Sequence, residues 1–404
     1  MSQGAERRWL AASHTSGPLP EETDVLVVGG GIAGAATAYY LARSGVEVLL
    51  VERGELNREA SGTNAGSLHL QLAIHQFSGH GTAADEQRLL GDLRASVEAF
   101  DFWRGLDEEL GESVDLHVTG GWMVAERPEE LETLRAKLAL EERAGLETHL
   151  VTGAQLRDVA PFFSDSVLGA TYCPAEGNAN PLVVAPLFAR RAVELGAEVR
   201  TGAAVLGIER GPGRTGDRFV VRTSRGTVRA HRVVDCAGAW SGHVAAMVGL
   251  RFPVRHEGLH VNVTDPRPPL LPAMVQHIGR RLTLKQASNG SFIIGGGWPA
   301  PWTGEGVRPP TVWSSAAGNT AVALDVVPEL ARANVVRTWS GVIVFTDDFA
   351  PVVGESHAVP GFFACVASTG FTFGPLYARR LADLMVGGGL PFPDSYSLDR
   401  VRDA

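Results

Sequence analysis

The stretch Asp24–Glu52 reads DVLVVGGGIAGAATAYYLARSGVEVLLVE, and it decides the fold of this chain. Its first apolar run, residues 25–28, predicts a strand. A glycine-rich turn and a run of small residues up to Arg43 then predict a helix, and a second apolar run, residues 46–51, predicts another strand. Strand, turn, helix and strand in this order predict an α/β fold that begins with a Rossmann-like unit.

Three glycines and one acid carry the chemistry of this unit. Gly29 permits the sharp turn, Gly31 lets the backbone approach a diphosphate, and Gly34 lets the helix lie close to the strand. Glu52 follows about 20 residues later, the spacing at which an acid meets a ribose hydroxyl. Free amides at the start of the helix would bind the diphosphate. The sequence therefore predicts that the chain binds an adenine dinucleotide.

The segment after this unit indicates which dinucleotide binds. Residues 53–71, RGELNREASGTNAGSLHLQ, resemble the D-amino-acid-oxidase superfamily of FAD enzymes, in which an Ala-Ser segment and an Asn-Ala-Gly turn follow the N-terminal unit. Residues 233–242, VVDCAGAWSG, are similar to the second FAD-contacting strand and turn of that superfamily. The resemblance implies a Rossmann-like FAD-binding domain interleaved with a mixed-sheet (α+β) substrate domain. It also implies non-covalent FAD, because no cysteine lies near residues 341–346, where one branch attaches the flavin.

The resemblance further implies which residues contact FAD. They lie on the N-terminal unit, on the segment after it, on the second motif and on a C-terminal loop. The expected contacts are Gly29, Gly31, Gly34, Glu52, Arg53, Ser61, Asn64, Ala65, Gly66, Ala204, Val205, Ala237, Gly238, Trp240, Gly341, Thr369, Gly370, Phe371 and Thr372. We expect residues 368–375, STGFTFGP, to form a loop, and a helix over residues 375–386 to direct its positive end at the flavin.

Helical and strand patterns predict interleaved domains. An apolar face predicts a core helix over residues 82–106, and residues 128–145 predict an exposed helix with one charged side. Short strands with turn residues are expected between residues 251 and 337. The predicted division is a flexible leader at 1–22, an FAD-binding domain of 23–75, 180–250 and 338–404, and a substrate-binding domain of 76–179 and 251–337.

Composition excludes several classes of protein. The 404 residues are 45% hydrophobic and 20% charged, as in a globular enzyme, and a net charge of -9 argues against nucleic-acid binding. Three scattered cysteines suit a reducing cytoplasm, and the histidines lack the spacing of metal ligands, so we expect no metal. No apolar run is long enough to cross a membrane. We expect a cytoplasmic protein, which partner subunits could hold at a membrane surface.

Three segments point to a narrower group within the superfamily. Asn64–Gln71, Arg281–Trp298 and Arg337–Gly341 resemble the flavin subunits of opine oxidases, D-hydroxyproline dehydrogenase and the cyanide-forming glycine dehydrogenase. This implies oxidation of a C–N bond in an amino acid, imino acid, secondary amine or opine. Hydride would pass to flavin N5, water would hydrolyse the imine, and small electron-transfer subunits would be partners. Two alternatives stay open: a flavin-bearing subunit that mainly builds a complex, and a pathway oxidoreductase with another substrate, such as a glycerol phosphate.

Four residues are candidates for the catalytic site: His69, Gln71, Lys285 and Thr369. His69 and Gln71 alternate after the Asn-Ala-Gly turn, so on an extended segment both would point to one face; the alternative is a polar pair satisfied in the core. In flavin amine oxidases a lysine near N5 commonly holds the water that activates oxygen. Lys285 could have this role, bind a substrate carboxylate, or face solvent. Thr369 can donate to a flavin carbonyl.

The chain departs from the glycine oxidase branch at one position. That branch carries an arginine that clamps the substrate carboxylate, whereas residues 342–344 of this chain are apolar. Either Arg280, Arg281 or Lys285 anchors the substrate, or the substrate is larger or has no carboxylate there. This favours an opine-like or cyclic amine substrate.

Overall fold

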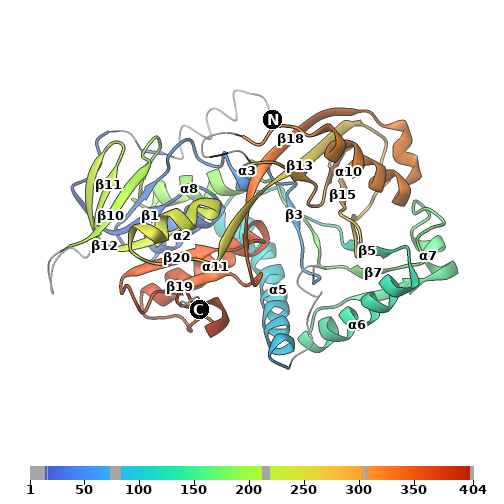
Figure 1. The fold of residues 1–404 in the computed structure, drawn as a ribbon, viewed down its shortest axis with the longest axis horizontal. Helices are drawn as coiled ribbons and strands as arrows, with labels where there is room; N and C mark the ends of the chain where they lie inside the picture. The colour runs from blue at the N-terminus through green and yellow to red at the C-terminus, as the bar shows by residue number, and fades with distance from the viewer. Residues whose placement is uncertain are drawn as a thin grey trace.

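The computed structural model describes residues 14–15, 17–72, 83–211, 219–302, 304 and 308–400. Two large sheets dominate the described part and lie in the two halves of the ribbon (Figure 1). Helix α5, Ala83–Leu110, lies between these halves. The mixture of parallel strands and covering helices confirms the α/β fold expected from the sequence.

The eight-stranded sheet contains the dinucleotide-binding unit. Strand β1, Glu22–Val28, lies between β2, Val48–Val51, and β12, Gly226–Asp235, and is parallel to both. Helices α2, Ile32–Arg43, and α11, Gly370–Met385, pack on each other in the core on one face. The remaining elements of this half are α8 (Val184–Glu194), β9 (Glu198–Arg200), β10 (Val205–Arg210), β11 (Phe219–Thr223), α9 (Ser241–Met247), β19 (Val352–Glu355) and β20 (Phe362–Val366).

The nine-stranded sheet forms the other half. Its two longest strands, β13 (Val254–Pro266) and β18 (Val335–Thr346), pair antiparallel along their length and run from one half of the molecule to the other (Figure 1). Strand β5 is parallel to β14 and antiparallel to β7, so the sheet is mixed, as expected. The other elements are β5 (Gly121–Ala125), α6 (Pro128–Ala144), β6 (His149–Thr152), α7 (Gly153–Val159), β7 (Gly169–Cys173), β14 (Met274–His277), β15 (Thr283–Gln286), β16 (Ser291–Gly295), β17 (Pro299–Ala300) and α10 (Trp313–Val326).

A small third sheet consists of three short strands. Strand β3, Ser67–Leu68, pairs with β8, Gly177–Asn178, which also pairs with β4, His117–Val118. The short helix α3, Ala60–Thr63, precedes β3. The other short helices are η1 (Gly238–Trp240), η2 (Pro328–Arg332) and η3 (Asp394–Tyr396).

Helix α6 corrects one prediction. We expected its charged residues to face solvent, yet its buried face carries Glu130, Lys137 and Glu141 beside Leu134. The charges can be buried because each forms internal hydrogen bonds or ion pairs. Helix α10 was not predicted, since its small and polar residues gave no clear helical face.

Three boundaries also differ from expectation. Helix α11 begins at Gly370, so most of the expected loop 368–375 is its first turn and a half. Strand β18 pairs with β13 in the nine-stranded sheet, whereas the predicted boundary at residue 338 divides it. Thr15 bonds to Val199 of β9, so this part of the expected leader lies along the sheet.

Candidate active site

The glycine turn allows close contact between backbone segments. Gly29 has a φ of +108°, and a Cβ there would lie 2.6 Å from the carbonyl oxygen of Cys236. A Cβ at Gly34 would lie 1.9 Å from the carbonyl oxygen of Gly29. A Cβ at Gly31 would lie 3.0 Å from Ser61 Oγ. A larger side chain at Gly29 or Gly34 would collide with the backbone, whereas one at Gly31 would press on the Ser61 hydroxyl. Such close packing is expected for a backbone cradle around a diphosphate.

The Glu52 carboxylate stabilises the glycine turn through hydrogen bonds. Its Oε2 accepts a hydrogen bond from the amide of Gly30 at 2.7 Å, and its Oε1 accepts one from the amide of Gly54 at 2.8 Å. A carboxylate oxygen has two lone pairs, so each can still accept a ribose hydroxyl. The Arg53 guanidinium lies 3.7 Å from the centre of the Trp240 ring. The structure thus brings Trp240 of the second motif beside the end of the first.

Residues 203–205 lie beside Glu52, to which a backbone hydrogen bond connects them. The amide of Ala203 donates to the carbonyl of Glu52 at 2.8 Å, and the amide of Ala204 donates to Ser224 Oγ at 3.0 Å. Val205 begins strand β10. In the part of the chain that the structure describes, a Cβ at Gly238 would meet no atom within 4 Å, so space lies beside this turn, which also contains Ala237.

Side chains of the Ala-Ser segment fix the next turns. Ser61 Oγ accepts from the amide of Ile32 at 2.9 Å and so caps the start of α2. Asn64 Oδ1 accepts from the amide of Gly66 at 2.6 Å across the turn that contains Ala65. A Cβ at Gly341 would lie 2.0 Å from an atom of α3, the hydroxyl oxygen of Thr63, so strand β18 approaches this segment closely. Local hydrogen bonds therefore set the shape of the expected flavin turn.

The start of α11 lies beside the start of α2. A Cβ at Gly374 would lie 3.6 Å from the Cγ2 of Ile32. Thr372 Oγ1 accepts from the amide of His69 at 3.2 Å, and its carbonyl accepts from the indole of Trp103 at 2.8 Å. The Phe371 ring lies 5.5 Å from the Trp103 ring. Two helix N-termini, both positive poles, suit an anionic diphosphate and an electron-rich ring. The residues present therefore fit FAD.

Lys285 and His69 lie next to the Asn-Ala-Gly turn. Lys285 Nζ is 3.3 Å from where a Cβ of Gly66 would be, and the side chain is 5% exposed. Burial lowers the pKa of Lys285 to about 7, against the opposing charge of Asp115. Burial, and then the charge of Lys285, lower the pKa of His69 to about 4. The two groups are thus a neutral imidazole and an amine that changes charge near neutral pH.

The described residues leave one polar atom beside the turn without a partner. His69 Nδ1 is buried and has no hydrogen-bond partner among them. The charge that acts on the Lys285 amine is that of Asp115. Buried polar groups are usually satisfied, so such atoms are expected where a ligand or water binds.

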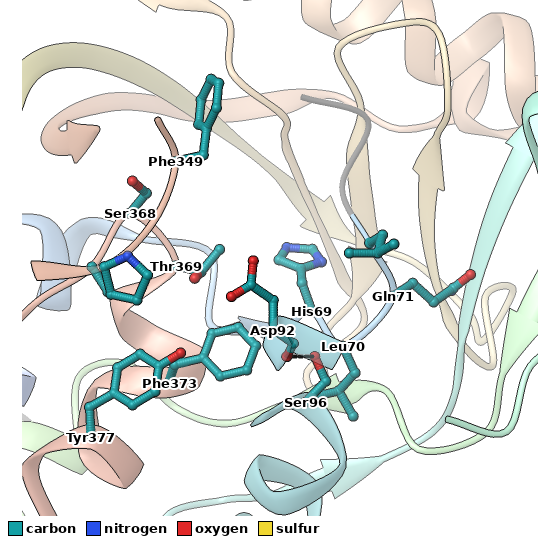
Figure 2. Close-up of a pocket in the computed structure, with 13 residues that line it drawn as sticks. His69, Leu70, Gln71, Asp92, Ser96, Phe349, Ser368, Thr369, Phe373 and Tyr377 are labelled. Carbon is teal, nitrogen blue, oxygen red and sulfur yellow. Dashed lines mark hydrogen bonds between the residues drawn. The ribbon is translucent and has the colours of Figure 1, made fainter. Parts of the chain in front are cut away.

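A cavity of about 30 Å³ adjoins His69, large enough for one or two water molecules (Figure 2). Asp92 and Ser96 of α5 line it opposite Thr369 and the first turn of α11. Burial raises the pKa of Asp92, which accepts a hydrogen bond from the Tyr396 hydroxyl at 2.8 Å. We did not predict Asp92 or Ser96 as site residues, although a carboxylate within the apolar face of α5 was a signal.

Gln71 does not share a face with His69. Its Nε2 donates to Glu176 Oε2 at 3.0 Å, and its Oε1 accepts from Lys137 Nζ at 3.1 Å and Thr171 Oγ1 at 2.8 Å. Figure 2 shows the Gln71 side chain extending away from the imidazole. The geometry favours the alternative for Gln71, a polar group satisfied in the core.

The three candidate anchors for a substrate carboxylate have different surroundings in the structure. Arg280 is bound to Glu126 at 2.7 Å and Asp325 at 2.6 Å. Arg281 is exposed and donates to the carbonyl of Gly297. The apolar residues 342–344 include two buried core valines. Of the three cations considered, Lys285 is the one beside the flavin turn.

Within the described ranges, no group of three or more His, Cys, Asp or Glu residues could hold a metal ion. The three cysteines are buried and form no disulfide. No helix in these ranges is both long and apolar enough to span a bilayer. His75 and His80 lie outside the described residues.

Known proteins resemble the chain along almost its whole length. The B subunit of opine oxidase from Rhizobium meliloti is 30% identical over 380 residues, which cover 91% of this chain and 95% of that protein. Mitochondrial sarcosine dehydrogenase of Mus musculus is 29% identical over 400 residues, which cover 95% of this chain and 42% of that protein. The chain therefore spans nearly all of the first relative and less than half of the second.

Solved structures share the fold. Glycine oxidase from Geobacillus kaustophilus superposes with a TM-score of 0.82 at 24% identity, covering 95% of this chain and 100% of that one. L-proline dehydrogenase from P. horikoshii gives a TM-score of 0.81 at 23% identity, covering 95% and 98%. The family model described as FAD dependent oxidoreductase matches residues 24–384. This match confirms both the resemblance and the cofactor expected from the sequence. The chain belongs to the DAO family of FAD dependent oxidoreductases.

Proposed function

We propose that this protein oxidises a C–N bond of an amino acid, imino acid, secondary amine or opine. The relatives support this class of substrate: the opine oxidase and the sarcosine dehydrogenase both carry such a compound in their names. When bound, FAD supplies the acceptor for a hydride from the carbon next to nitrogen. The imine that results reacts with water to give a carbonyl compound and an amine.

The observation that carries this proposal is the Lys285 amine beside Gly66 of the flavin turn, 3.3 Å from the Cβ position and almost fully buried. With a pKa of about 7, this amine can be either neutral or charged at physiological pH. In the charged form it can bind a carboxylate or a reduced oxygen species, and in the neutral form it can accept a proton. His69, with a low pKa, adds no second positive charge at this place.

The chain's other groups bind and orient. The helix N-termini and the glycine turn would hold the cofactor, and we propose that they hold it without a covalent bond, since Cys365 and Cys236 are buried in the core. Thr369, at the start of α11, lines the cavity beside His69 and can donate a hydrogen bond there. The predicted roles of Glu52, Gly341 and the other expected FAD contacts are part of the same proposal.

An anaerobic titration tests the function. The visible spectrum of the purified yellow protein is followed while D-amino acids, imino acids, sarcosine and opines are added one at a time. Bleaching of the flavin band by one of them is the expected result, and that compound gives the substrate class. If dithionite bleaches the flavin and none of these compounds does, the proposed function is wrong. The result would then favour a pathway oxidoreductase with a substrate of another class.

The second candidate function is that of a flavin subunit that passes its electrons to a partner. It is favoured by two relatives, the B subunit of opine oxidase and the beta subunit of sarcosine oxidase, whose names make them parts of larger enzymes. The test is to admit air after substrate reduction. Fast return of the yellow colour indicates an oxidase, whereas slow return in air and fast return with a soluble dye indicates a dehydrogenase that needs an acceptor. The cytoplasmic location expected from the sequence stays a prediction.

A further inference from the structure

Residues 70–72, which lie just beyond strand β3, are held by side chains and not by a neighbouring strand. The amides of Leu70 and Gln71 both donate to Glu176 Oε1, at 2.8 and 2.9 Å. The next amide, that of Leu72, donates to Glu141 Oε1 at 2.9 Å. Two carboxylates from distant parts of the chain therefore clamp three successive amides.

The two carboxylates belong to one buried network. Lys137 Nζ donates to Glu141 Oε1 at 2.6 Å and to Gln71 Oε1 at 3.1 Å, and Gln71 Nε2 donates to Glu176 Oε2 at 3.0 Å. Lys137, Glu141 and Glu176 are all 0% exposed. The network thus connects helix α6, the β7–β8 turn and the clamped segment in the interior of the molecule.

The hydrogen-bond partners of Glu176 suit an ionised carboxylate. Its hydrogen-bond neighbours among the described residues are donors: the amides of Leu70 and Gln71 and the side-chain amides of Gln71 and Gln276. A protonated carboxyl group would direct its own hydrogen at one of these donors. Burial raises the pKa of Glu176 above its ordinary value, and the hydrogen bonds of Gln71 and Leu70 offset only part of this rise.

Packing alone does not explain such a network. Buried charges lose their hydration, and apolar residues of similar volume often stabilise a core as well or better. Apolar contacts have no preferred direction, however, so they cannot fix the position and orientation of a segment whose amides pair with no strand. The clamped segment follows His69 directly, and the His69 amide is itself bonded to Thr372 at the start of α11.

We propose that Glu176, Glu141 and Lys137 are positioning residues that fix the chain at Leu70–Leu72 and thereby hold the His69 imidazole beside the Lys285 amine at the flavin turn. The inference rests on the proposed function for the roles of His69 and Lys285. Beyond that function, we infer that this buried charged network determines the position of His69 relative to Lys285.

Glu176→Gln is the first test. Its amide nitrogen would face the side-chain donors of Gln71 and Gln276, and its neutral oxygen would accept more weakly from the backbone amides than a carboxylate oxygen does. The clamp on the backbone should therefore loosen while the volume stays the same. We expect hydrogen exchange of a peptide covering residues 69–72 to become about tenfold faster, and a peptide of strand β1 to be unchanged. Per bound FAD, the slower half-reaction should fall about 10- to 100-fold, with substrate affinity nearly unchanged.

A second variant tests the proposal if Glu176→Gln does not fold. Lys137→Met combined with Glu141→Leu removes both charges, keeps the volume and takes the acceptor from Leu72. Because apolar packing replaces the ion pair, the double variant should fold and bind FAD, yet show the same loss of rate. Glu176→Asp keeps the charge and should recover part of the rate. The matched control is Glu130→Gln on the same helix. This buried glutamate accepts hydrogen bonds from the Arg127 side chain and the backbone amide of Glu126 instead, and we expect the rates of the variant to be unchanged.

Two results distinguish failure of the positioning proposal from failure of the proposed function. If both variants keep their half-reaction rates per FAD and only melt earlier, the network merely stabilises the fold and the proposal is overturned. If the wild-type flavin is not reduced by any C–N compound, the proposed function fails, but hydrogen exchange at residues 69–72 and the visible spectrum of bound FAD still report on the clamp. Unchanged exchange and an unchanged spectrum in both variants would then overturn it.

Discussion

The Lys285 amine is buried in an environment that disfavours its charge. Its pKa falls from an ordinary 10.5 to about 7, and burial is the main cause. Between these pH values the unfolded chain binds more protons than the folded one, so stability rises as the pH rises from about 7 to about 10.5. Below about pH 7 the full cost of burying the charge is present. An amine kept in such a place is typical of a functional group.

Lys285→Met should therefore stabilise the fold and slow the reaction. At pH 6 we expect the free energy of unfolding to rise on the order of 2–4 kcal/mol, because the buried charge is removed, and the gain should shrink towards pH 10. One half-reaction should slow by orders of magnitude. Urea denaturation at pH 6 and 9, with stopped-flow reduction and reoxidation, measures both. Equal stability at pH 6 and unchanged turnover would mean that the amine is solvated.

A substitution at Gly31 should prevent FAD from binding. Gly31→Glu would place a Cβ 3.0 Å from Ser61 Oγ and a carboxylate at the start of α2, where the diphosphate is expected. The purified variant should be colourless. Gly105→Glu, at an exposed position of α5 with no described atom within 4 Å, is the control and should stay yellow. A yellow Gly31→Glu protein would contradict the placement of the cofactor.

Among the elements, helix α6 gives a prediction about stability. Lys137→Met alone leaves the buried Glu141 carboxylate without its cation, and we expect a loss of about 3–5 kcal/mol in the free energy of unfolding. Adding Glu141→Leu should restore most of it, since no unpaired charge remains. Urea denaturation of the two variants and the wild type measures the difference. Additive losses in the double variant would show that the two residues are not coupled.

Helices also show where sequence patterns fail. The start of α11 was predicted at Pro375, because the family resemblance placed a loop over residues 368–375. In the structure, bonds from His69 and Trp103 to Thr372 accompany an earlier start, with Pro375 inside the helix. Helix α6 was expected to be an exposed helix with one charged side, because charged residues usually face solvent. Both errors come from tertiary contacts that no local pattern contains.

For the whole molecule, the dinucleotide-binding half was the easier part to predict. Strand, turn, helix and strand are contiguous in residues 24–52, so their mutual geometry is already specified locally. The rest of the site is assembled from distant segments. Lys285 could be proposed only through the family resemblance, and Asp92 and Glu176 gave no motif. Where each of them lies relative to the flavin turn depends on the tertiary packing.

FAD should also stabilise the molecule as a whole. Its expected contacts come from segments as distant as Gly29 and Thr372, so the bound cofactor would join them. With free FAD at 100 times its dissociation constant, the folded state should gain about 2.7 kcal/mol. Thermal melting of the stripped protein over a series of FAD concentrations measures this. A melting temperature that does not depend on FAD would argue that these segments do not form one binding site.

The contact between Thr15 and β9 has a consequence for association between molecules. Strand β9 is the last strand of the eight-stranded sheet, and Thr15 bonds to both the amide and the carbonyl of Val199. The guanidinium of Arg200 also donates to the carbonyl of Pro18. An uncovered last strand is a template on which a second chain can add and begin an aggregate. A few residues that enter no sheet therefore help to keep one molecule from joining the next.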